Sequence, residues 1–164
     1  MIDPLRLTFT VACDAEHAFS TWTGRVSLWW PVDHTVSQRS GVKVLIEPVV
    51  GGRIFEKAPS GQEFDWGWVT IWDPPGRLAY KWHLGAEPRH ATDVEVTFAQ
   101  RPDGTTQVDI EHRGWDAFGP DAEPRRRGNQ AGWSEVLPLF AAACQTGRPV
   151  VPAPAPGLAP APGP

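Results

Sequence analysis

The chain has 164 residues, of which 41% are hydrophobic and 21% charged, and its formal net charge is −4 at pH 7. This length and composition are typical of one globular domain. The mildly acidic balance argues against a nucleic-acid-binding protein, which needs a basic surface. No apolar run approaches the roughly 20 residues that a membrane-spanning helix requires.

The start of the chain and its cysteines indicate the compartment. Residues 1–6 lack the basic and then apolar layout of a signal peptide, so we expect a cytoplasmic protein. Cys13 and Cys144 lie near opposite ends of the predicted domain and have no metal-ligand spacing. We interpret them as small buried or semi-buried thiols.

The first elements predicted are one strand and two short helices. Apolar and polar residues alternate over residues 5–11, which predicts a half-buried strand. Asp14 is placed to cap a helix that ends near Gly24, and residues 26–30 form a second short helix ended by Pro31. The apolar face of the first helix consists of Ala15, Ala18, Phe19 and Trp22.

From residue 42 onward the apolar pattern has a period of two, which predicts sequential antiparallel strands. The predicted strands are residues 42–46, 53–57, 64–72, 78–84, 94–98 and 107–113. Strict alternation places His112 on an apolar face with Val108 and Ile110. On the strand over residues 64–72, alternation puts Phe64, Trp66, Trp68 and Trp72 on one face and Val69 and Ile71 on the other. The period does not decide which of these two faces is inward.

The domain ends in a long helix. Pro124 suits a position in its first turn, and Pro138 is expected to kink it. Its apolar stripe consists of Trp133, Val136, Leu137, Phe140 and Cys144. The only long helix has to cover the buried face of the sheet. We therefore predict an α+β fold, in which a curved antiparallel sheet of about six to seven strands grips the C-terminal helix, with a ligand space where sheet and helix diverge.

The last 18 residues differ in composition from the rest. Seven of the residues 147–164 are proline, and most of the others are Ala, Val and Gly. Such a segment has little that could form a core. We predict a disordered or polyproline-II-like tail and a folded domain over residues 1–146.

Several short motifs, in this order, resemble those of the SRPBCC superfamily of START-like (birch-pollen-allergen-like) helix-grip proteins. They are Trp29-Trp30-Pro31, Ile46-Glu47-Pro48 with Gly51-Gly52-Arg53, Trp66-Gly67 with Val69, the segment Trp72 to Leu78, Lys81-Trp82, Glu111-His112-Arg113-Gly114-Trp115 and Gly132-Trp133. The branch most similar to this chain comprises bacterial relatives of the activator of the 90-kDa heat-shock chaperone's ATPase. The chain resembles the C-terminal domain of that two-domain activator.

The resemblance implies a range of functions, because the superfamily includes lipid carriers, resistance proteins, aromatic-polyketide cyclases and chaperone regulators. Our first hypothesis is a non-catalytic domain that binds an apolar or aromatic small molecule. The alternatives are a chaperone-associated stress-response protein and an enzyme of cyclase or hydrolase type that uses His112. We expect no cofactor, no metal and no membrane or nucleic-acid partner, and a monomer or weak dimer.

The candidate ligand-binding residues are Trp29, Trp30, His34, Glu47, Trp82, His112 and Trp133. Each tryptophan has two interpretations, core filling or the wall of an aromatic pocket. His112 is either a hydrogen-bonded core residue or a donor, acid or base facing the ligand, with Glu47 and Glu56 as possible partners. His34 is predicted at the pocket mouth. Arg125, Arg126 and Arg127 form either a solvated helix face or a docking patch for an acidic partner.

Overall fold

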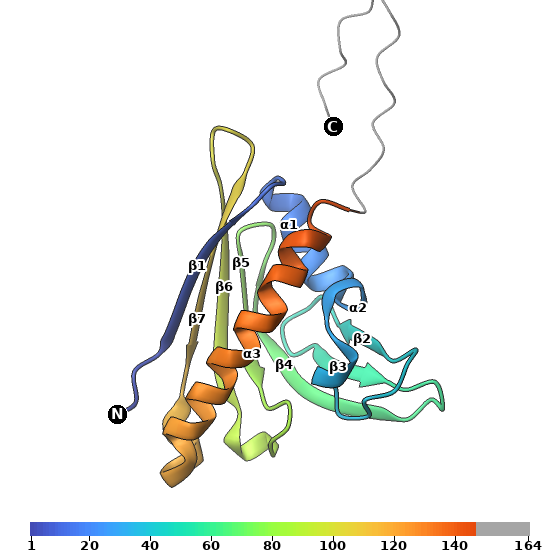
Figure 1. Ribbon diagram of the computed structural model, residues 1–164, viewed down its shortest axis with the longest axis vertical. Helices are drawn as coiled ribbons and strands as arrows, with labels where there is room; N and C mark the ends of the chain where they lie inside the picture. Colours follow the sequence, from blue (N-terminus) through green and yellow to red (C-terminus); the bar gives the residue numbers. More distant parts are fainter. Residues whose placement is uncertain (147–164) are drawn as a thin grey trace, which may run out of the picture.

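The computed structural model describes residues 1–146, and the predicted tail over residues 147–164 lies outside the described residues. The described part contains one seven-stranded antiparallel sheet in the order β1-β7-β6-β5-β4-β3-β2. One long helix, α3, lies across a face of this curved sheet, and α1 and α2 lie beside the C-terminal half of α3 (Figure 1). The predicted α+β helix-grip fold is confirmed.

The elements follow the predicted order closely. Between them lie three short 3₁₀ helices, η1 to η3, that the periodicity did not indicate. The elements are β1 (Leu5–Val11), α1 (Ala15–Gly24), α2 (Val26–Trp29), η1 (Val32–His34), β2 (Lys43–Ile46), β3 (Arg53–Lys57), β4 (Glu63–Asp73), β5 (Arg77–Trp82), η2 (Pro88–His90), β6 (Thr92–Gln100), β7 (Thr106–Arg113), η3 (Trp115–Asp121) and α3 (Ala122–Ala143).

The two N-terminal helices begin and end where their sequence signals lie. The Asp14 carboxylate accepts a hydrogen bond of 2.8 Å from the amide of His17 and so caps α1. Helix α2 is a single turn that ends at Trp29, and Trp30 is its extended C-cap residue, directly before Pro31. This sharp stop places the Trp30 side chain next to the long helix rather than in solvent.

The sheet is an open meander that its first strand extends at one edge. Strands β2 to β7 pair with their sequence neighbours, and β1 returns to pair with β7 from Leu5 opposite His112 to Val11 opposite Thr106. Alternate residues of β6 and β7 are buried under α3, and His112 is among them. The predicted inward orientation of His112 is therefore confirmed.

Strand β4 departs from strict alternation. Its pairing shifts register between Ile54 and Phe55 of β3, and again between its own residues Val69 and Ile71. Each irregularity inserts one residue and reverses which face the following side chains take. The prediction that Trp66 and Trp68 share a face is therefore wrong, because Trp66 is fully buried whereas Trp68 is 37% exposed.

The core lies between the sheet and α3 and is rich in aromatic rings. Trp133, Val136 and Phe140 of α3 are buried, as the apolar stripe predicts. The Trp22 ring of α1 lies 6.0 Å from the ring of Trp133 and 4.9 Å from that of Phe140. Both cysteines are buried, in agreement with their interpretation as core thiols.

Two further features concern surface and membrane. In the described residues, no helix has the length and apolar character to cross a membrane. At the start of α3, Arg126 donates to the backbone carbonyls of Asp3 and Pro4, and the guanidinium of Arg125 lies 4.9 Å from the ring of Phe118. These two arginines therefore fasten the helix to neighbouring segments.

Candidate functional site

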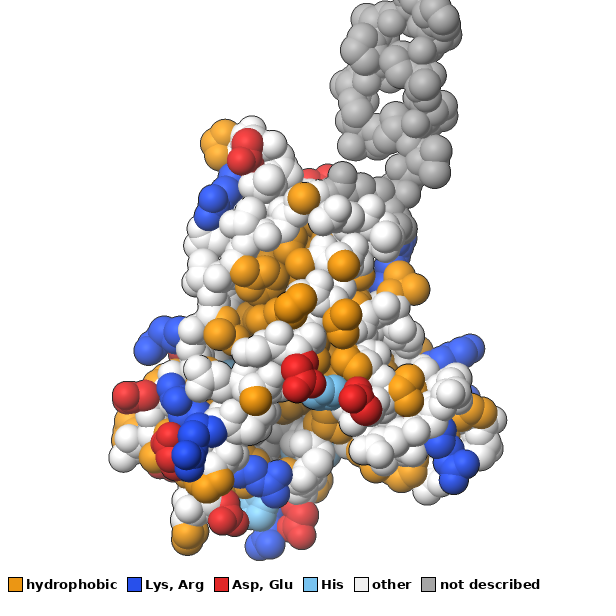
Figure 2. Space-filling view, in the orientation of Figure 1, with side chains coloured by type: hydrophobic (Ala, Val, Ile, Leu, Met, Phe, Trp, Pro, Cys, Tyr) orange, Lys and Arg blue, Asp and Glu red, His pale blue; other side chains and the backbone are white. Residues whose placement is uncertain are grey.

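A groove of ≈ 260 Å³ opens on the surface between α3, η1 and the end of β5. Four of the seven predicted site residues line it, namely Trp30, His34, Trp82 and Trp133. Figure 2 shows a hollow on this face below a histidine with acidic side chains on either side. Residues from the C-cap of α2, from η1, from β5 and from α3 thus meet at one place.

A polar bridge spans the groove. The Nε2 atom of His34 lies 2.8 Å from a carboxylate oxygen of Glu135 on α3. The carbonyl of His34 in turn accepts a hydrogen bond of 3.0 Å from the indole nitrogen of Trp30. His34 therefore connects the C-cap of α2 to the long helix beside the groove that it lines.

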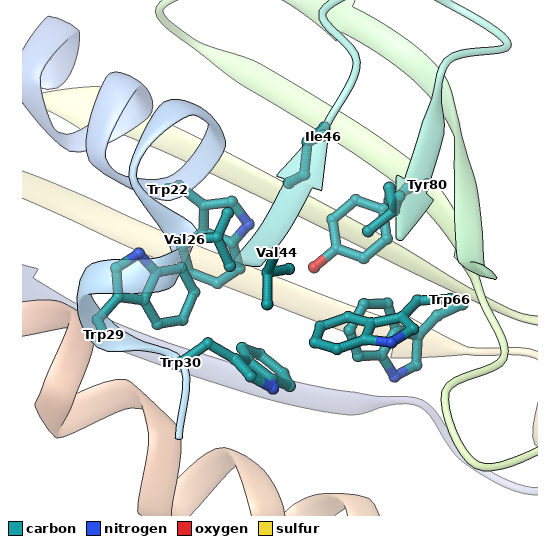
Figure 3. A pocket seen from close by; sticks show the side chains of 10 residues that line it. Trp22, Val26, Trp29, Trp30, Val44, Ile46, Trp66 and Tyr80 are labelled. Carbon is teal, nitrogen blue, oxygen red and sulfur yellow. The ribbon is translucent and has the colours of Figure 1, made fainter. Parts of the chain in front are cut away.

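Behind the groove lies a small apolar void of ≈ 10 Å³, enough for about one water molecule. Trp29, Trp30 and Trp82 contribute to its wall, and Trp30 and Trp82 also line the groove. Figure 3 shows the indoles of Trp22, Trp29, Trp30 and Trp66 arranged around this space. This void lies between the sheet and the segment of α1 and α2 and is largely filled by aromatic side chains, whereas the open volume beside α3 lies in the groove.

Trp30 and Trp82 line both the void and the groove, and the buried Trp66 packs against both of them. The ring centroid of Trp30 lies 5.3 Å from that of Trp66 and 5.5 Å from that of Trp82, and the Trp66 and Trp82 centroids are 5.6 Å apart. These spacings are typical of favourable aromatic contacts. Trp30 and Trp82 are partly exposed, whereas Trp66 is buried.

His112 belongs to a hydrogen-bonded network beneath the groove. The indole nitrogen of Trp133 donates to His112 Nδ1 at 3.1 Å, which places the imidazole proton on Nε2 because indole cannot accept. Nε2 lies 2.7 Å from the hydroxyl of Thr92, and that hydroxyl donates to the carbonyl of Trp82 at 3.2 Å. The network thus joins α3 to strands β7, β6 and β5 and connects two groove-lining tryptophans.

Burial governs the protonation of His112. Desolvation lowers the pKa of this fully buried imidazole from 6.5 to about 3, so the ring is neutral at physiological pH. The ring packs 4.2 Å from that of Trp115, and its side chain lines neither the groove nor the void. Of the two interpretations of His112, the geometry favours the hydrogen-bonded core residue.

Glu47 lies apart from the other candidates. Its side chain is exposed at the turn between β2 and β3, where the carboxylate accepts a hydrogen bond of 2.7 Å from the amide of Arg53. It lines neither space. The prediction that Glu47 orients a ligand beside His112 therefore has no geometric basis. The alternation of apolar and polar residues does not reveal that Glu47 lies in the turn after β2.

Glu56 is the buried acid of this region. It is fully buried on β3, and it accepts hydrogen bonds from the amide of Val36, the amide and hydroxyl of Ser37, and the indole of Trp66. Burial alone would raise the pKa of this carboxyl, but the hydrogen bonds from Ser37, Val36 and Trp66 outweigh it and lower the pKa below 4.5. Glu56 therefore acts as an ionised clamp that holds the loop after η1 against the sheet.

Several residues of the site escaped the sequence reasoning. Trp22, Trp66 and Tyr80 line the void, and Glu135 lines the groove. Trp22 and Tyr80 lay on predicted apolar faces, but core and pocket walls have the same periodicity. Glu135 is a polar residue on the exposed side of a helix, and nothing in its pattern singles it out. Among residues 1–146, no group of three or more His, Cys, Asp or Glu side chains could hold a metal ion.

Comparison with protein families gives one match that spans most of the chain. The family model described as "Activator of Hsp90 ATPase homolog 1-like protein" matches residues 12–145. No curated protein matches the chain.

Solved structures share the fold over nearly their whole length. CalC from Micromonospora echinospora, described as a self-sacrificing resistance protein, is 28% identical, with 87% of this chain and 94% of that chain covered and a TM-score of 0.67. Txn09, described as an anthrahydroquino-γ-pyrone synthase, is 32% identical, with coverage of 86% and 96% and a TM-score of 0.60. A structural-genomics protein from Mesorhizobium loti is 20% identical, with coverage of 87% and 96% and a TM-score of 0.65.

Proposed function

Because the chain belongs to the family of Activator of Hsp90 ATPase homolog 1-like proteins, we propose that it is a non-catalytic domain that binds an apolar or aromatic small molecule between its sheet and α3. One observation carries this proposal. A surface groove and an aromatic void adjoin at the same two side chains, Trp30 and Trp82. A ligand entering the groove would meet indole faces at once, which is the lining typical of small-molecule sites.

The proposed roles follow from position. Trp30, Trp82 and Trp133 supply apolar contact, and burial of ligand surface contributes about 25 cal/mol per Å² before entropic losses. His34 offers a polar contact at the mouth. His112 positions Trp133 and Trp82 from beneath, and Trp29 forms the deeper wall.

The description of Txn09 supports a small-molecule ligand over a protein partner. Txn09 is described as a synthase of an aromatic pyrone, and CalC as a resistance protein. Their sequences are 32% and 28% identical to this chain. The buried, hydrogen-bonded state of His112 disfavours the alternative of an enzyme that uses this residue as acid or base.

The test uses tryptophan fluorescence and the thermal midpoint of unfolding against a set of apolar and aromatic compounds. A true ligand changes the fluorescence and raises the midpoint with concentration, as binding linkage requires. Gly132 lines the groove on α3, and a Cβ there meets no atom within 4 Å. We therefore expect Gly132→Ala to raise the free energy of unfolding by about 0.5–1 kcal/mol while weakening ligand binding.

The matched control is Ser134→Ala, at an exposed position of α3 that does not line the groove. This variant should leave ligand affinity unchanged. If Gly132→Ala and Ser134→Ala bind every active compound as tightly as the wild type, the ligand does not occupy the groove. If no compound in the set binds, the proposed function fails.

The family description favours a second candidate, an interaction protein that regulates a heat-shock chaperone. In that role the outer surface of the domain would carry the function. The direct measurement is the ATPase rate of the cognate Hsp90 chaperone at saturating concentrations of this protein. An unchanged rate would eliminate this candidate without bearing on ligand binding.

A further inference from the structure

We propose that the aromatic void is the closed form of a ligand site, and that the hydroxyl of Tyr80 selects neutral, planar aromatic compounds that carry a carbonyl group. Entry requires displacement of the Trp30 indole. The inference rests on the proposed function, which it makes specific, and it starts from a polar group in an otherwise apolar space. Of the ten residues that line the void, all belong to the described part and none carries a charge.

Tyr80 is the phenol of this space. It lies on β5 between the inward-facing Leu78 and Trp82, and only 4% of its surface is exposed. Its hydroxyl points into the void, toward the gap between Val44 and Trp66 (Figure 3). A hydroxyl directed into an apolar cavity is costly unless it finds a partner, so its position calls for an explanation.

The hydroxyl proton of Tyr80 remains available for a hydrogen bond to a ligand. The Trp22 indole interacts with the Tyr80 hydroxyl in the sense that lowers its pKa, and because indole nitrogen is a donor only, this interaction engages a lone pair of the phenolic oxygen. Neighbouring indole donors have other acceptors, since Trp29 donates to the carbonyl of Thr21 and Trp66 to the carboxylate of Glu56. A bound compound with an acceptor atom would accept the hydrogen bond that the Tyr80 hydroxyl can donate.

The surroundings define the acceptor further. Burial raises the pKa of Tyr80 far above its usual value, so the hydroxyl stays protonated and acts as a donor throughout the physiological range. An anionic ligand would lose its hydration with no cation in the lining to replace it. A neutral carbonyl oxygen accepts a hydrogen bond without that loss. The indoles of Trp66 and Trp82 meet nearly at a right angle, so a planar ring can stack on the face of one and contact the edge of the other, which favours aromatic compounds over branched aliphatic chains.

Trp30 is the side chain whose movement opens the site. Its ring is partly exposed and lines both spaces, and it follows a helix of a single turn. It is held by the bond from its indole nitrogen to the carbonyl of His34, which the bridge to Glu135 supports. When the indole leaves, groove and void become one pocket. The space that the Trp30 indole vacates is that of one bicyclic ring, and it joins the groove of ≈ 260 Å³.

The experiment compares 9-fluorenone with fluorene, two planar tricyclic compounds that differ in one carbonyl group. Affinities are measured by quenching of tryptophan fluorescence for the wild type and for Tyr80→Phe, which keeps the ring and removes the hydroxyl. We expect the wild type to bind fluorenone more tightly than fluorene by about fivefold, the usual effect of one net hydrogen bond. Tyr80→Phe should lose this preference, because the buried carbonyl of fluorenone then has no donor to replace its hydration.

The outcomes separate this inference from the function on which it rests. If both compounds bind but Tyr80→Phe leaves their ratio unchanged, the role of Tyr80 is overturned while the binding function stands. If neither compound binds to the wild type or to Trp30→Ala, this inference fails, whereas the proposed function fails only if no compound of the wider set binds. Stopped-flow mixing tests the entry route, because Trp30→Ala should raise the association rate constant at least about tenfold over that of the wild type. An unchanged rate constant would overturn the gate.

Discussion

The hydrogen bonds of His112 show what one buried polar residue does for this fold. Both ring nitrogens are bonded inside the protein, one to the indole of Trp133 and one to the hydroxyl of Thr92. The direction of these bonds requires a neutral ring with its proton on Nε2. Protonation would set the added proton on Nδ1 against the Trp133 N–H, so the folded state disfavours the cation.

This network predicts how stability depends on pH. The pKa of His112 is about 3 in the folded protein and 6.5 as an ordinary value, so below pH 6.5 the unfolded chain binds a proton that the folded chain refuses. The contribution of His112 to the free energy of unfolding is complete above pH 6.5 and decreases by about 1.4 kcal/mol per pH unit toward pH 3. Urea unfolding of the wild type and of His112→Gln between pH 8 and 4 measures it.

The pH dependence that the other histidines contribute cancels in the comparison, because they are present in both proteins. His112→Gln should be less stable at pH 8 and should lose less stability on acidification than the wild type. Parallel pH profiles for the two proteins would show that His112 titrates normally, and would contradict the assignment of both ring nitrogens to internal bonds.

Strand β4 illustrates why elements were predicted better than the orientation of their side chains. Its extent follows from a run of aromatic and β-branched residues, and residues 64–72 agree with the observed Glu63–Asp73. Its two register shifts depend on the neighbouring strands, which a single-strand pattern does not contain. The glycine at position 67 was the available signal, because glycine inside a strand often marks a bulge or a close approach of backbone.

Gly67 is a position where that close approach can be tested. A Cβ atom there would lie 1.8 Å from the carbonyl oxygen of Lys81 on β5. The backbones of the paired strands β4 and β5 cannot move apart without breaking their hydrogen bonds. Gly67→Ala should therefore destabilise the protein by at least about 3 kcal/mol or prevent folding. Denaturant unfolding gives the value.

Gly76→Ala is the control for this substitution, since a Cβ at Gly76 meets no atom within 4 Å and lies in the following turn. It should change the free energy of unfolding by less than about 1 kcal/mol. Equal stabilities for Gly67→Ala and Gly76→Ala would mean that β4 and β5 separate at this point.

At the scale of the whole molecule, the arrangement of elements was the most predictable feature. One strand, two short helices, a meander and one long amphipathic helix leave a single way to bury the sheet, and the motif order agreed with it. The site was partly predictable, because Trp30, His34, Trp82 and Trp133 meet in the groove. The sequence did not predict how far aromatic side chains fill the interior, because side chains such as Trp66 and Trp22 are equally suited to line a cavity or to close it.

The domain boundary after residue 146 remains a prediction, and the end of α3 supplies an argument for it. The amides of Gln145 and Thr146 donate to the carbonyls of Ala142 and Ala143, and the carbonyl of Thr146 lies 3.2 Å from Nε2 of His17 on α1. The last turn of the helix is thus completed and attached to α1 by residues up to 146.

We therefore expect the chain shortened to residues 1–146 to unfold with a free energy within about 0.5 kcal/mol of the full chain, because these terminal hydrogen bonds are all retained. Thermal and urea unfolding of the two proteins under identical conditions measure the difference. His17→Ala in the shortened chain tests the attachment to α1 and should lower stability slightly. A loss of several kcal/mol on shortening alone would show that residues 147–164 contribute to the folded domain, and would place its boundary further along the chain.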